Sequence, residues 1–167
     1  MAKLKVPTIS IVIGEGSSGG ALALGVTDVI IMLENAVYSI LSPEGFASIL
    51  YKDSGKASEA ADKMKITSNE LKKLGIIDNI IEEPKGGAQE DFDAVCKNLK
   101  NTILKDIKKL LNKPQEELIE QRYEKYRNID CANESVYIRT DYQEIANAIG
   151  MSIRTVGRNL KKLKEMK

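Results

Sequence analysis

Histidine and tryptophan are absent from this sequence of 167 residues, and there are only two cysteines, Cys96 and Cys131. Without histidine, a general acid or base must be another side chain or come from a partner molecule. Two isolated cysteines also leave no Cys/His zinc centre and no disulfide framework, so we expect no metal site. Cys96 falls on the apolar face of an expected helix, where we expect it to pack in the core.

Long apolar runs and an excess of one charge are also lacking. No segment reaches the length of a membrane span, and Met1–Lys5 lacks the apolar part of a signal peptide, so we expect a cytoplasmic protein without membrane contact. The net charge is +1 and predicts no general attraction to nucleic acid. Residues 1–130 hold 18 basic and 20 acidic side chains, however, whereas residues 131–167 hold 7 and 4, so the basic excess lies at the C-terminus.

The most informative segment is Thr8–Gly25. A run of β-branched residues ends at four glycines and two serines within seven positions, and an Ala/Leu segment follows. This pattern predicts a strand, a glycine turn and a helix that begins near Gly19. The unpaired N–H groups and the positive dipole end of such a helix suit an anion or a developing oxyanion.

Three interpretations of these glycines remain open. In the first, the G-x-G-x-x-G spacing and an acidic residue twenty positions after its first glycine mark a dinucleotide site, formed by Gly14, Gly16, Gly19 and Glu34. The crossover helix of about two turns is short for that fold. In the second, the amides of Gly19 and Gly20 form an oxyanion hole. In the third, the glycines only permit close packing of the helix on the sheet.

The following elements predict an α/β or mixed sheet with flanking helices. Apolar strands are expected over residues 28–33, 36–41 and 76–81, and helices over 42–51, 56–65, 67–74, 90–111 and from Pro114 onward. Ser42 and the capping box Thr67–Glu70 predict two helix starts. The two long helices are expected to act as scaffold or subunit interface. We also expect a linker over residues 128–135. It divides the chain into one domain over residues 1–130 and a second segment over residues 131–167.

The second segment has the pattern of a helix-turn-helix. A capping box at Thr140–Gln143 opens a short helix, Gly150 lies in the turn, and Ser152 caps a second helix. Basic side chains occupy the outer face of that helix, at Arg154, Arg158, Lys161 and Lys162. They indicate either a DNA-recognition helix or only a solvated basic face.

Residues 6–130 closely resemble the C-terminal half of the carboxyltransferase alpha subunit of bacterial acetyl-CoA carboxylase. The matching segments are Val6–Leu24, Met32–Gly45, Met64–Thr67, Leu74–Asp78 and Gln121–Arg127. This resemblance implies a partial ClpP/crotonase-type α/β fold with long C-terminal helices. It also implies a complex of two alpha and two beta subunits, which transfers a carboxyl group from carboxybiotin on the biotin carboxyl carrier protein to acetyl-CoA. The product is malonyl-CoA for fatty-acid biosynthesis.

The same resemblance assigns the carboxybiotin site to Gly16, Ser17, Ser18, Gly19 and Gly20. The amides of Gly19 and Gly20 would polarise the ureido oxygen, where one preorganised donor contributes about 3 kcal/mol. The beta subunit would supply most of the coenzyme A site and the zinc. The chain begins after the large N-terminal part of the family and has Gln89 where histidine is usual. We therefore expect no carboxyltransferase activity from this chain with the beta subunit alone.

Residues 136–166 resemble the helix-turn-helix of cyclic-AMP-receptor-type transcription regulators, through the segment Tyr142–Leu163. This resemblance implies duplex DNA as a partner, with Arg158 as the guanine reader. The implied DNA-contacting residues are Ser152, Arg154, Thr155 and Arg158. Ile153 and Arg154 replace the usual Arg-Glu pair. Two partial families joined near Asp130 point to a fused or mis-assembled reading frame more than to an evolved bifunctional enzyme.

Overall fold

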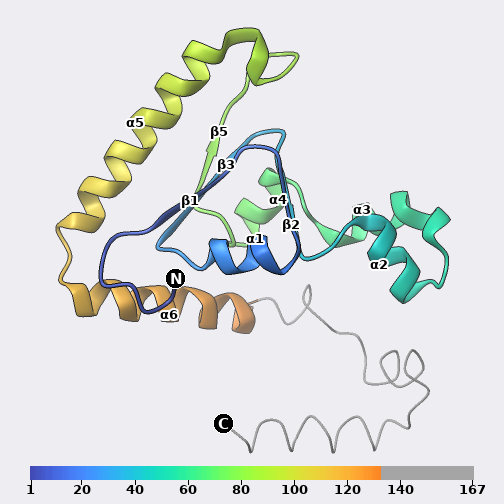
Figure 1. The fold of residues 1–167 in the computed structure, drawn as a ribbon, viewed down its shortest axis with the longest axis horizontal. Coiled ribbons are helices and arrows are strands. Elements are labelled where there is room, and N and C mark those ends of the chain that lie inside the picture. The colour runs from blue at the N-terminus through green and yellow to red at the C-terminus, as the bar shows by residue number, and fades with distance from the viewer. Residues whose placement is uncertain (133–167) are drawn as a thin grey trace, which may run out of the picture.

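The computed structural model describes residues 1–132, shown as a ribbon in Figure 1. The expected helix-turn-helix, with its DNA-contacting residues Ser152, Arg154, Thr155 and Arg158, lies outside the described residues. The strands are β1 (Ile9–Val12), β2 (Glu15–Ser17), β3 (Val29–Leu33), β4 (Val37–Ser39) and β5 (Asn79–Ile81). The α-helices are α1 (Ser18–Gly25), α2 (Pro43–Leu50), α3 (Ala57–Met64), α4 (Ser68–Lys73), α5 (Phe92–Leu111) and α6 (Gln115–Ala132), with 3-10 turns at Ser54–Lys56 and Ala88–Asp91.

A parallel sheet in the order β1-β3-β5 forms the centre of the molecule. In its register Ile9 pairs with Val29, and Leu33 pairs with Ile81. The middle strand β3 is almost wholly apolar and buried, which suits a parallel strand covered on both faces. Strands β2 and β4 form a second, two-stranded parallel sheet. The α/β class expected from the sequence is confirmed.

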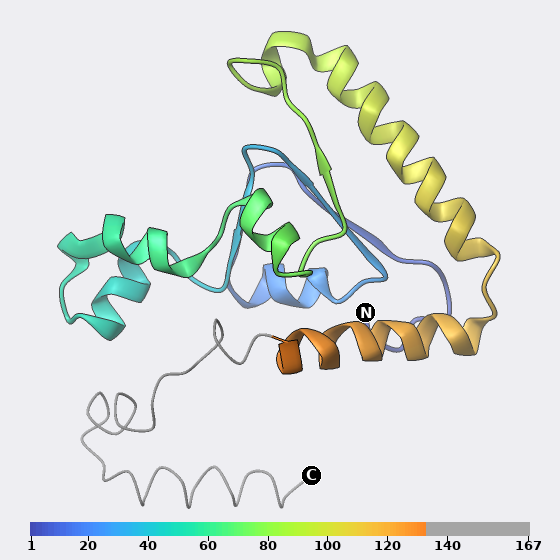
Figure 2. The same cartoon turned by 180° about the vertical axis from the view of Figure 1, so that it is seen from behind.

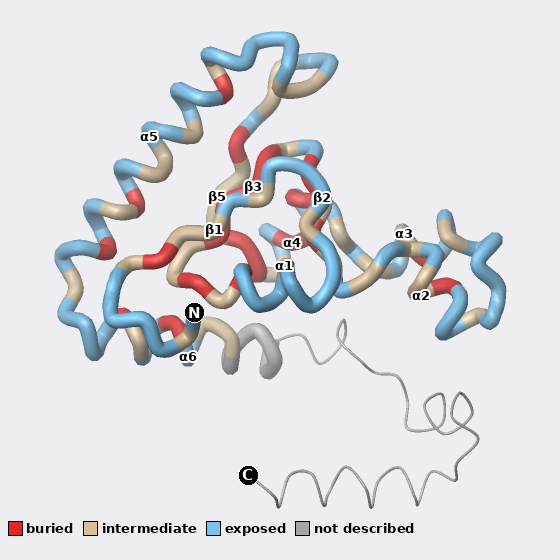
Figure 3. Tube along the Cα trace, viewed as in Figure 1, coloured by how far each residue is buried: buried red, intermediate tan, exposed pale blue. Residues whose placement is uncertain are grey.

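The hydrophobic core follows β3 and the segment from α4 to β5, as the buried positions in Figure 3 show. Its fully buried apolar side chains include Ile30, Ile31, Met32 and Leu71. The strand expected over residues 76–81 is confined to Asn79–Ile81, because Ile76 and Ile77 are buried in the turn that leads from α4 into β5. The core therefore depends on a loop as well as on the sheet.

The local signals for two helix starts are confirmed. The Ser42 hydroxyl accepts a hydrogen bond from the Gly45 N–H at 3.2 Å, at the start of α2. At the start of α4, the Glu70 carboxylate accepts hydrogen bonds from the Thr67 hydroxyl at 2.8 Å and from its N–H at 3.4 Å. Helices α2 and α3 pack against each other through Ala47 and Ala60, and Figures 1 and 2 show this pair beside the central sheet rather than on it.

The expectation that Cys96 packs in the core is wrong, since its side chain is exposed. Helix α5 turns Val95, Leu99 and Ile103 toward the core, and Cys96 lies on the flank of that face. Helix α6 continues to Ala132, so the first residues of the expected linker are helical. None of the helices within residues 1–132 is long and apolar enough to cross a membrane.

Candidate functional site

The glycine-rich segment contains a strand as well as a turn. Residues 15–17 pair with residues 37–39 as strands β2 and β4, with Gly16 opposite Tyr38. The bend after β1 is therefore limited to Ile13 and Gly14. Helix α1 begins at Ser18, one residue before the start predicted from the sequence. The five residues of the expected carboxybiotin site thus occupy two elements: Gly16 and Ser17 end β2, and Ser18, Gly19 and Gly20 form the first turn of α1.

The first turn of α1 presents two open glycine amides. Gly19 and Gly20 are exposed, and a Cβ built on either would meet no atom within 4 Å. The N–H groups of a first helical turn have no partner within the helix, so these two are free to bind a ligand oxygen. Ser18 has a φ of +71°, a left-handed conformation that costs an L-residue roughly 1–2 kcal/mol. Strained backbone of this kind gathers at ligand-binding positions.

Close packing explains two other glycines of the segment. A Cβ on Gly25 would lie 2.1 Å from the Tyr38 hydroxyl oxygen, and one on Gly16 would lie 3.0 Å from Cδ2 of the same ring. The packing interpretation therefore holds for Gly16 and Gly25, where the Tyr38 side chain takes the space. It does not account for Gly19 and Gly20, whose surroundings leave room for a side chain.

The dinucleotide interpretation is not supported by this geometry. The fingerprint requires a tight glycine turn, but Gly16 lies within β2. The acidic residue that would bind a ribose, Glu34, accepts a hydrogen bond from the Glu83 N–H at 3.0 Å. Strand β4 also pairs with β2 and does not extend the central sheet, as a doubly wound fold would require. Of the three interpretations, an anion or oxyanion site at Gly19 and Gly20 fits best.

Two tyrosines hold α1 in place, Tyr38 at Ala21 and Tyr126 at the C-terminal end of the helix. The Tyr38 hydroxyl donates to the Ala21 carbonyl at 3.0 Å. The Tyr126 hydroxyl donates to the Gly25 carbonyl at 2.5 Å and accepts from the Thr27 N–H at 3.0 Å. Burial raises the pKa of Tyr126 to about 12, so its hydroxyl stays protonated at neutral pH. Neither tyrosine was predicted from the sequence to contact this helix.

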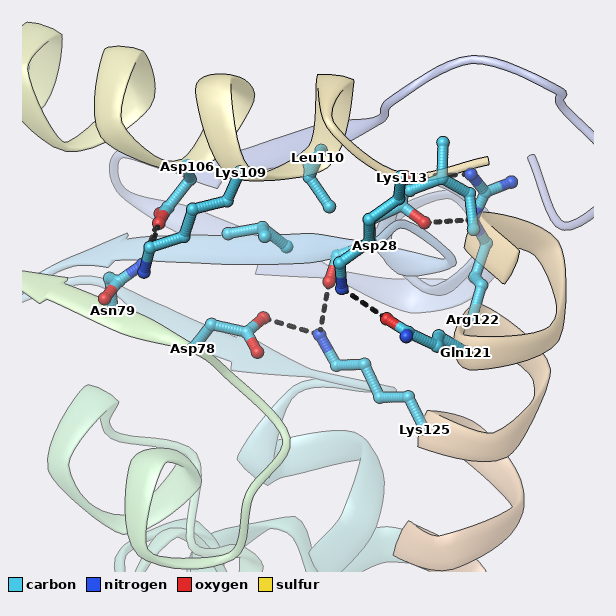
Figure 4. A pocket seen from close by; sticks show the side chains of 12 residues that line it. Asp28, Asp78, Asn79, Asp106, Lys109, Leu110, Lys113, Gln121, Arg122 and Lys125 are labelled. Atoms are coloured by element: carbon cyan, nitrogen blue, oxygen red, sulfur yellow. Dashed lines mark hydrogen bonds and ion pairs between the residues drawn. The ribbon is translucent and has the colours of Figure 1, made fainter. Parts of the chain in front are cut away.

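A polar centre joins α6 to the beginning of β3, and Figure 4 shows it at close range. Arg122, with 1% of its surface exposed, forms an ion pair with Asp28 at 2.8 Å. The same guanidinium donates hydrogen bonds to the carbonyls of Met1, Ala2, Leu4 and Val6. Burial by itself would raise the pKa of Asp28, but hydrogen bonds from Arg122 and Thr8 outweigh it and hold that pKa below its ordinary value.

This polar centre lines a hollow of about 420 Å³ between the sheet, α5 and α6. Lys125 forms an ion pair with Asp78 at 2.5 Å, and Asp78 also accepts from the Ile30 N–H at 2.7 Å. Asn79 donates to Asp106 at 2.6 Å. These polar contacts attach α5 and α6 to the sheet. In the sequence, the α6 residues that make these contacts were indicated only by the family-like segment Gln121–Arg127, which supplies Arg122, Lys125 and Tyr126.

No group of three or more histidine, cysteine, aspartate or glutamate side chains within residues 1–132 is arranged to hold a metal ion. The start of α1 offers the two glycine amides and the hydroxyl of Ser18, and the hydroxyl of Ser17 lies next to them at the end of β2. Ser17 lies 3.4 Å from Ser39 across the β2–β4 pair, measured between the two Oγ atoms.

Comparisons with known proteins agree with these observations. The sequence profile of the family described as acetyl co-enzyme A carboxylase carboxyltransferase-like matches residues 1–130. An acetyl-coenzyme A carboxylase carboxyl transferase subunit alpha from Clostridium acetobutylicum is 57% identical over 129 residues, which are 77% of this chain and 47% of the relative. The Shouchella clausii subunit alpha is also 57% identical over 129 residues, with 40% of the relative covered.

A relative named as subunits beta/alpha, from Natranaerobius thermophilus, is 59% identical over 129 residues, which are 21% of its length. The chain therefore spans about half, or less, of the curated relatives it matches. A second profile, of bacterial regulatory proteins of the crp family, matches residues 142–167. The two matches do not overlap, and the second falls wholly outside the described residues.

Proposed function

This chain belongs to the acetyl-CoA carboxylase carboxyltransferase-like family, and we propose that residues 1–130 provide the alpha-subunit side of a carboxyltransferase site. The reaction would transfer a carboxyl group from carboxybiotin to acetyl-CoA, giving malonyl-CoA for fatty-acid biosynthesis. The fold of the complete unit would be of the crotonase type. The proposed partners are a carboxyltransferase beta subunit, which would carry the coenzyme A site and the zinc, and a biotin carboxyl carrier protein.

The observation that carries this proposal is the open pair of amides at Gly19 and Gly20. Their N–H groups begin α1, where the positive end of the helix dipole adds to their attraction for negative charge. The site fits a small planar acceptor such as the ureido oxygen of biotin, because the space that a Cβ would fill is empty at both positions. Bound carboxybiotin would supply the activated carboxyl group.

The part played by this chain is electrostatic. The two amides would donate to the oxygen on which negative charge grows as the carboxyl group departs, and one such donor is worth about 3 kcal/mol. They would be preorganised because hydrogen bonds from Tyr38 and Tyr126 hold α1 in place. Gly16, Ser17 and Ser18 would line the same site, with the glycine allowing β2 to lie against Tyr38. Since the chain has no histidine, no imidazole of its own takes part.

A chimera tests this proposal. Residues 1–130 replace the matched part of the Clostridium acetobutylicum alpha subunit, and malonyl-CoA formation is measured with its beta subunit and carboxylated carrier protein. We expect activity near that of the parent complex, because the exchanged part is 57% identical. A folded chimera that assembles with the beta subunit but forms no malonyl-CoA would contradict the proposal.

We also infer a second function, duplex DNA binding by residues 142–167, on the crp-family match and the basic excess beyond residue 130. The proposed DNA contacts are Ser152, Arg154, Thr155 and Arg158, with Arg158 reading guanine. The full chain is titrated with duplex DNA at rising salt, where the affinity should fall steeply. Arg158→Ala should weaken binding by about 1–3 kcal/mol, whereas Arg139→Ala, outside the matched segment, should not. Absence of salt-dependent binding would overturn this second function.

A further inference from the structure

Helix α1 has an N-cap serine that does not cap it. Ser17 is extended, with a φ of −136° and a ψ of 162°, and an N-cap serine in this conformation ordinarily accepts a hydrogen bond from the second or third N–H of its helix. In α1 those two N–H groups belong to Gly19 and Gly20, but the Ser17 side chain forms no capping hydrogen bond. Ser42 caps α2 and Asp91 caps α5 in the ordinary way. The two amides are therefore open although a residue that could close them is in place.

The Ser17 hydroxyl faces β4 instead. In the β2–β4 register Ser17 lies opposite Ser39, and their Oγ atoms are 3.4 Å apart. The Ser39 hydroxyl donates to the Leu41 carbonyl at 2.9 Å. Because a serine hydroxyl carries one proton, Ser39 must accept in its contact with Ser17, and Ser17 is the donor. The contact is longer than an ordinary hydroxyl hydrogen bond, so one substitution can reverse the balance between it and a cap.

We propose that Ser39 is a positioning residue, which holds the Ser17 hydroxyl away from the Gly19 and Gly20 amides and so keeps them open to a ligand oxygen. The inference rests on the proposed function only for the identity of that oxygen, the ureido oxygen of carboxybiotin. Without Ser39, the Ser17 hydroxyl would turn and accept a hydrogen bond from one of the two amides. A ligand would then have to displace this cap, which shifts such an equilibrium by about fivefold.

Amide hydrogen exchange in the full chain, followed by nuclear magnetic resonance, tests this role without the reaction. In Ser39→Ala, exchange at the Gly19 or Gly20 amide should slow by about fivefold, because the Ser17 hydroxyl accepts from it. Adding Ser17→Ala should restore fast exchange, since alanine cannot cap the helix. Ser39→Thr keeps the hydroxyl and suits a strand, so its exchange should match the wild-type chain. Unchanged exchange in Ser39→Ala would overturn the proposal.

Kinetics of the chimera with its beta subunit provide the second measurement. Ser39→Ala should lower kcat/KM for the carboxylated carrier protein by about fivefold, through KM rather than kcat, because a saturating ligand displaces the cap. In a chimera that already carries Ser17→Ala, the same change should have no further effect. Ser48→Ala is the matched control, since the Ser48 hydroxyl donates to the Glu44 carbonyl within α2 at 2.7 Å, and it should leave KM unchanged. Equal losses from Ser39→Ala with and without Ser17 would contradict the positioning role.

The two measurements also separate this proposal from the proposed function. An inactive parent chimera, together with slower exchange in Ser39→Ala, would contradict the carboxyl transfer and support the role of Ser39. An active chimera, together with unchanged exchange and an unchanged KM in Ser39→Ala, would contradict the role of Ser39 alone.

Discussion

Arg122 binds Asp28 through two parallel hydrogen bonds, from Nε to Oδ1 at 2.9 Å and from Nη2 to Oδ2 at 2.8 Å. This bidentate pair joins α6 to the residue that precedes β3, although 94 positions separate the two in the sequence. The further bonds from Arg122 to carbonyls of residues 1–6 attach the N-terminal segment to the same helix. One buried guanidinium thus connects both ends of the carboxyltransferase-like region.

Arg122→Ala should lower the free energy of unfolding by about 3–5 kcal/mol. The substitution leaves the buried Asp28 carboxylate without its charged partner and frees several carbonyls of residues 1–6. Urea unfolding followed by circular dichroism measures the change. Lys109→Ala is the control, because the Lys109 side chain is 64% exposed and lies 3.8 Å from Asp106, so its loss should change stability by less than about 1 kcal/mol.

The stability contributed by Asp28 should depend on pH. Its pKa in the folded chain lies below the ordinary value of 3.8, so the folded state binds this proton less tightly than the unfolded state does. The contribution is therefore complete above that value and declines as the pH falls through the lower, folded pKa. The difference in unfolding free energy between the wild-type chain and Asp28→Asn should narrow below pH 3.8. A difference that is constant from pH 7 to pH 2 would show that the carboxylate has no such role.

Tyr126→Phe should destabilise the chain by about 1–3 kcal/mol. The change removes the acceptor for the Thr27 N–H and the donor to the Gly25 carbonyl, and Thr27 is fully buried. Tyr123→Phe is its control on the same helix, since Tyr123 is 47% exposed, and it should change stability by less than about 0.5 kcal/mol. Thermal unfolding of the three proteins compares them directly, and equal midpoints would contradict the attachment of α6 to α1.

Ser18→Gly should stabilise the chain by up to about 1 kcal/mol. The substitution relieves the backbone strain at this position, and the greater freedom of glycine in the unfolded state offsets part of that gain. Ser18 adopts a φ of +71°, which glycine accepts without strain. Ser17→Gly should destabilise the chain instead, because Ser17 has a φ of −136° in β2 and glycine weakens a strand. Denaturant midpoints measure both changes, and a loss of stability in Ser18→Gly would show that the serine side chain matters more than the backbone strain.

Local signals in the sequence predicted most of the secondary structure within residues 1–132. Ser42, Pro43 and the Thr67–Glu70 box act within one helical turn, so their effect can be read without knowing the tertiary fold. Gly75 is a local signal as well, because its φ of +70° is the left-handed conformation that commonly follows the end of a helix, here α4. The apolar runs likewise predicted β1 and β3 to within one residue of their observed bounds.

Features that depend on contacts distant in sequence could not be predicted in this way. Gly16 belongs to β2 only because residues 37–39 lie beside it, and a strand of three residues has no periodicity to detect. Cys96 is exposed because the rest of the core covers α5 only in part. Arg122 is buried for the same kind of reason, since its partners come from the other end of the described chain.

The open glycine amides at the start of α1 form the centre of the proposed carboxybiotin site, and the variant Gly20→Ala in the chimera tests them. A methyl group there meets no neighbour within 4 Å and suits a helix, so the free energy of unfolding should rise by about 0.5–1 kcal/mol. Malonyl-CoA formation should nevertheless fall by about 100-fold, as for the loss of one donor, because the methyl group would push the ligand oxygen away from the Gly20 N–H. Gly14→Ala, which is equally open but lies outside the helix, should leave the rate unchanged. A Gly20→Ala chimera that is as active as its parent would contradict the proposed role of these amides.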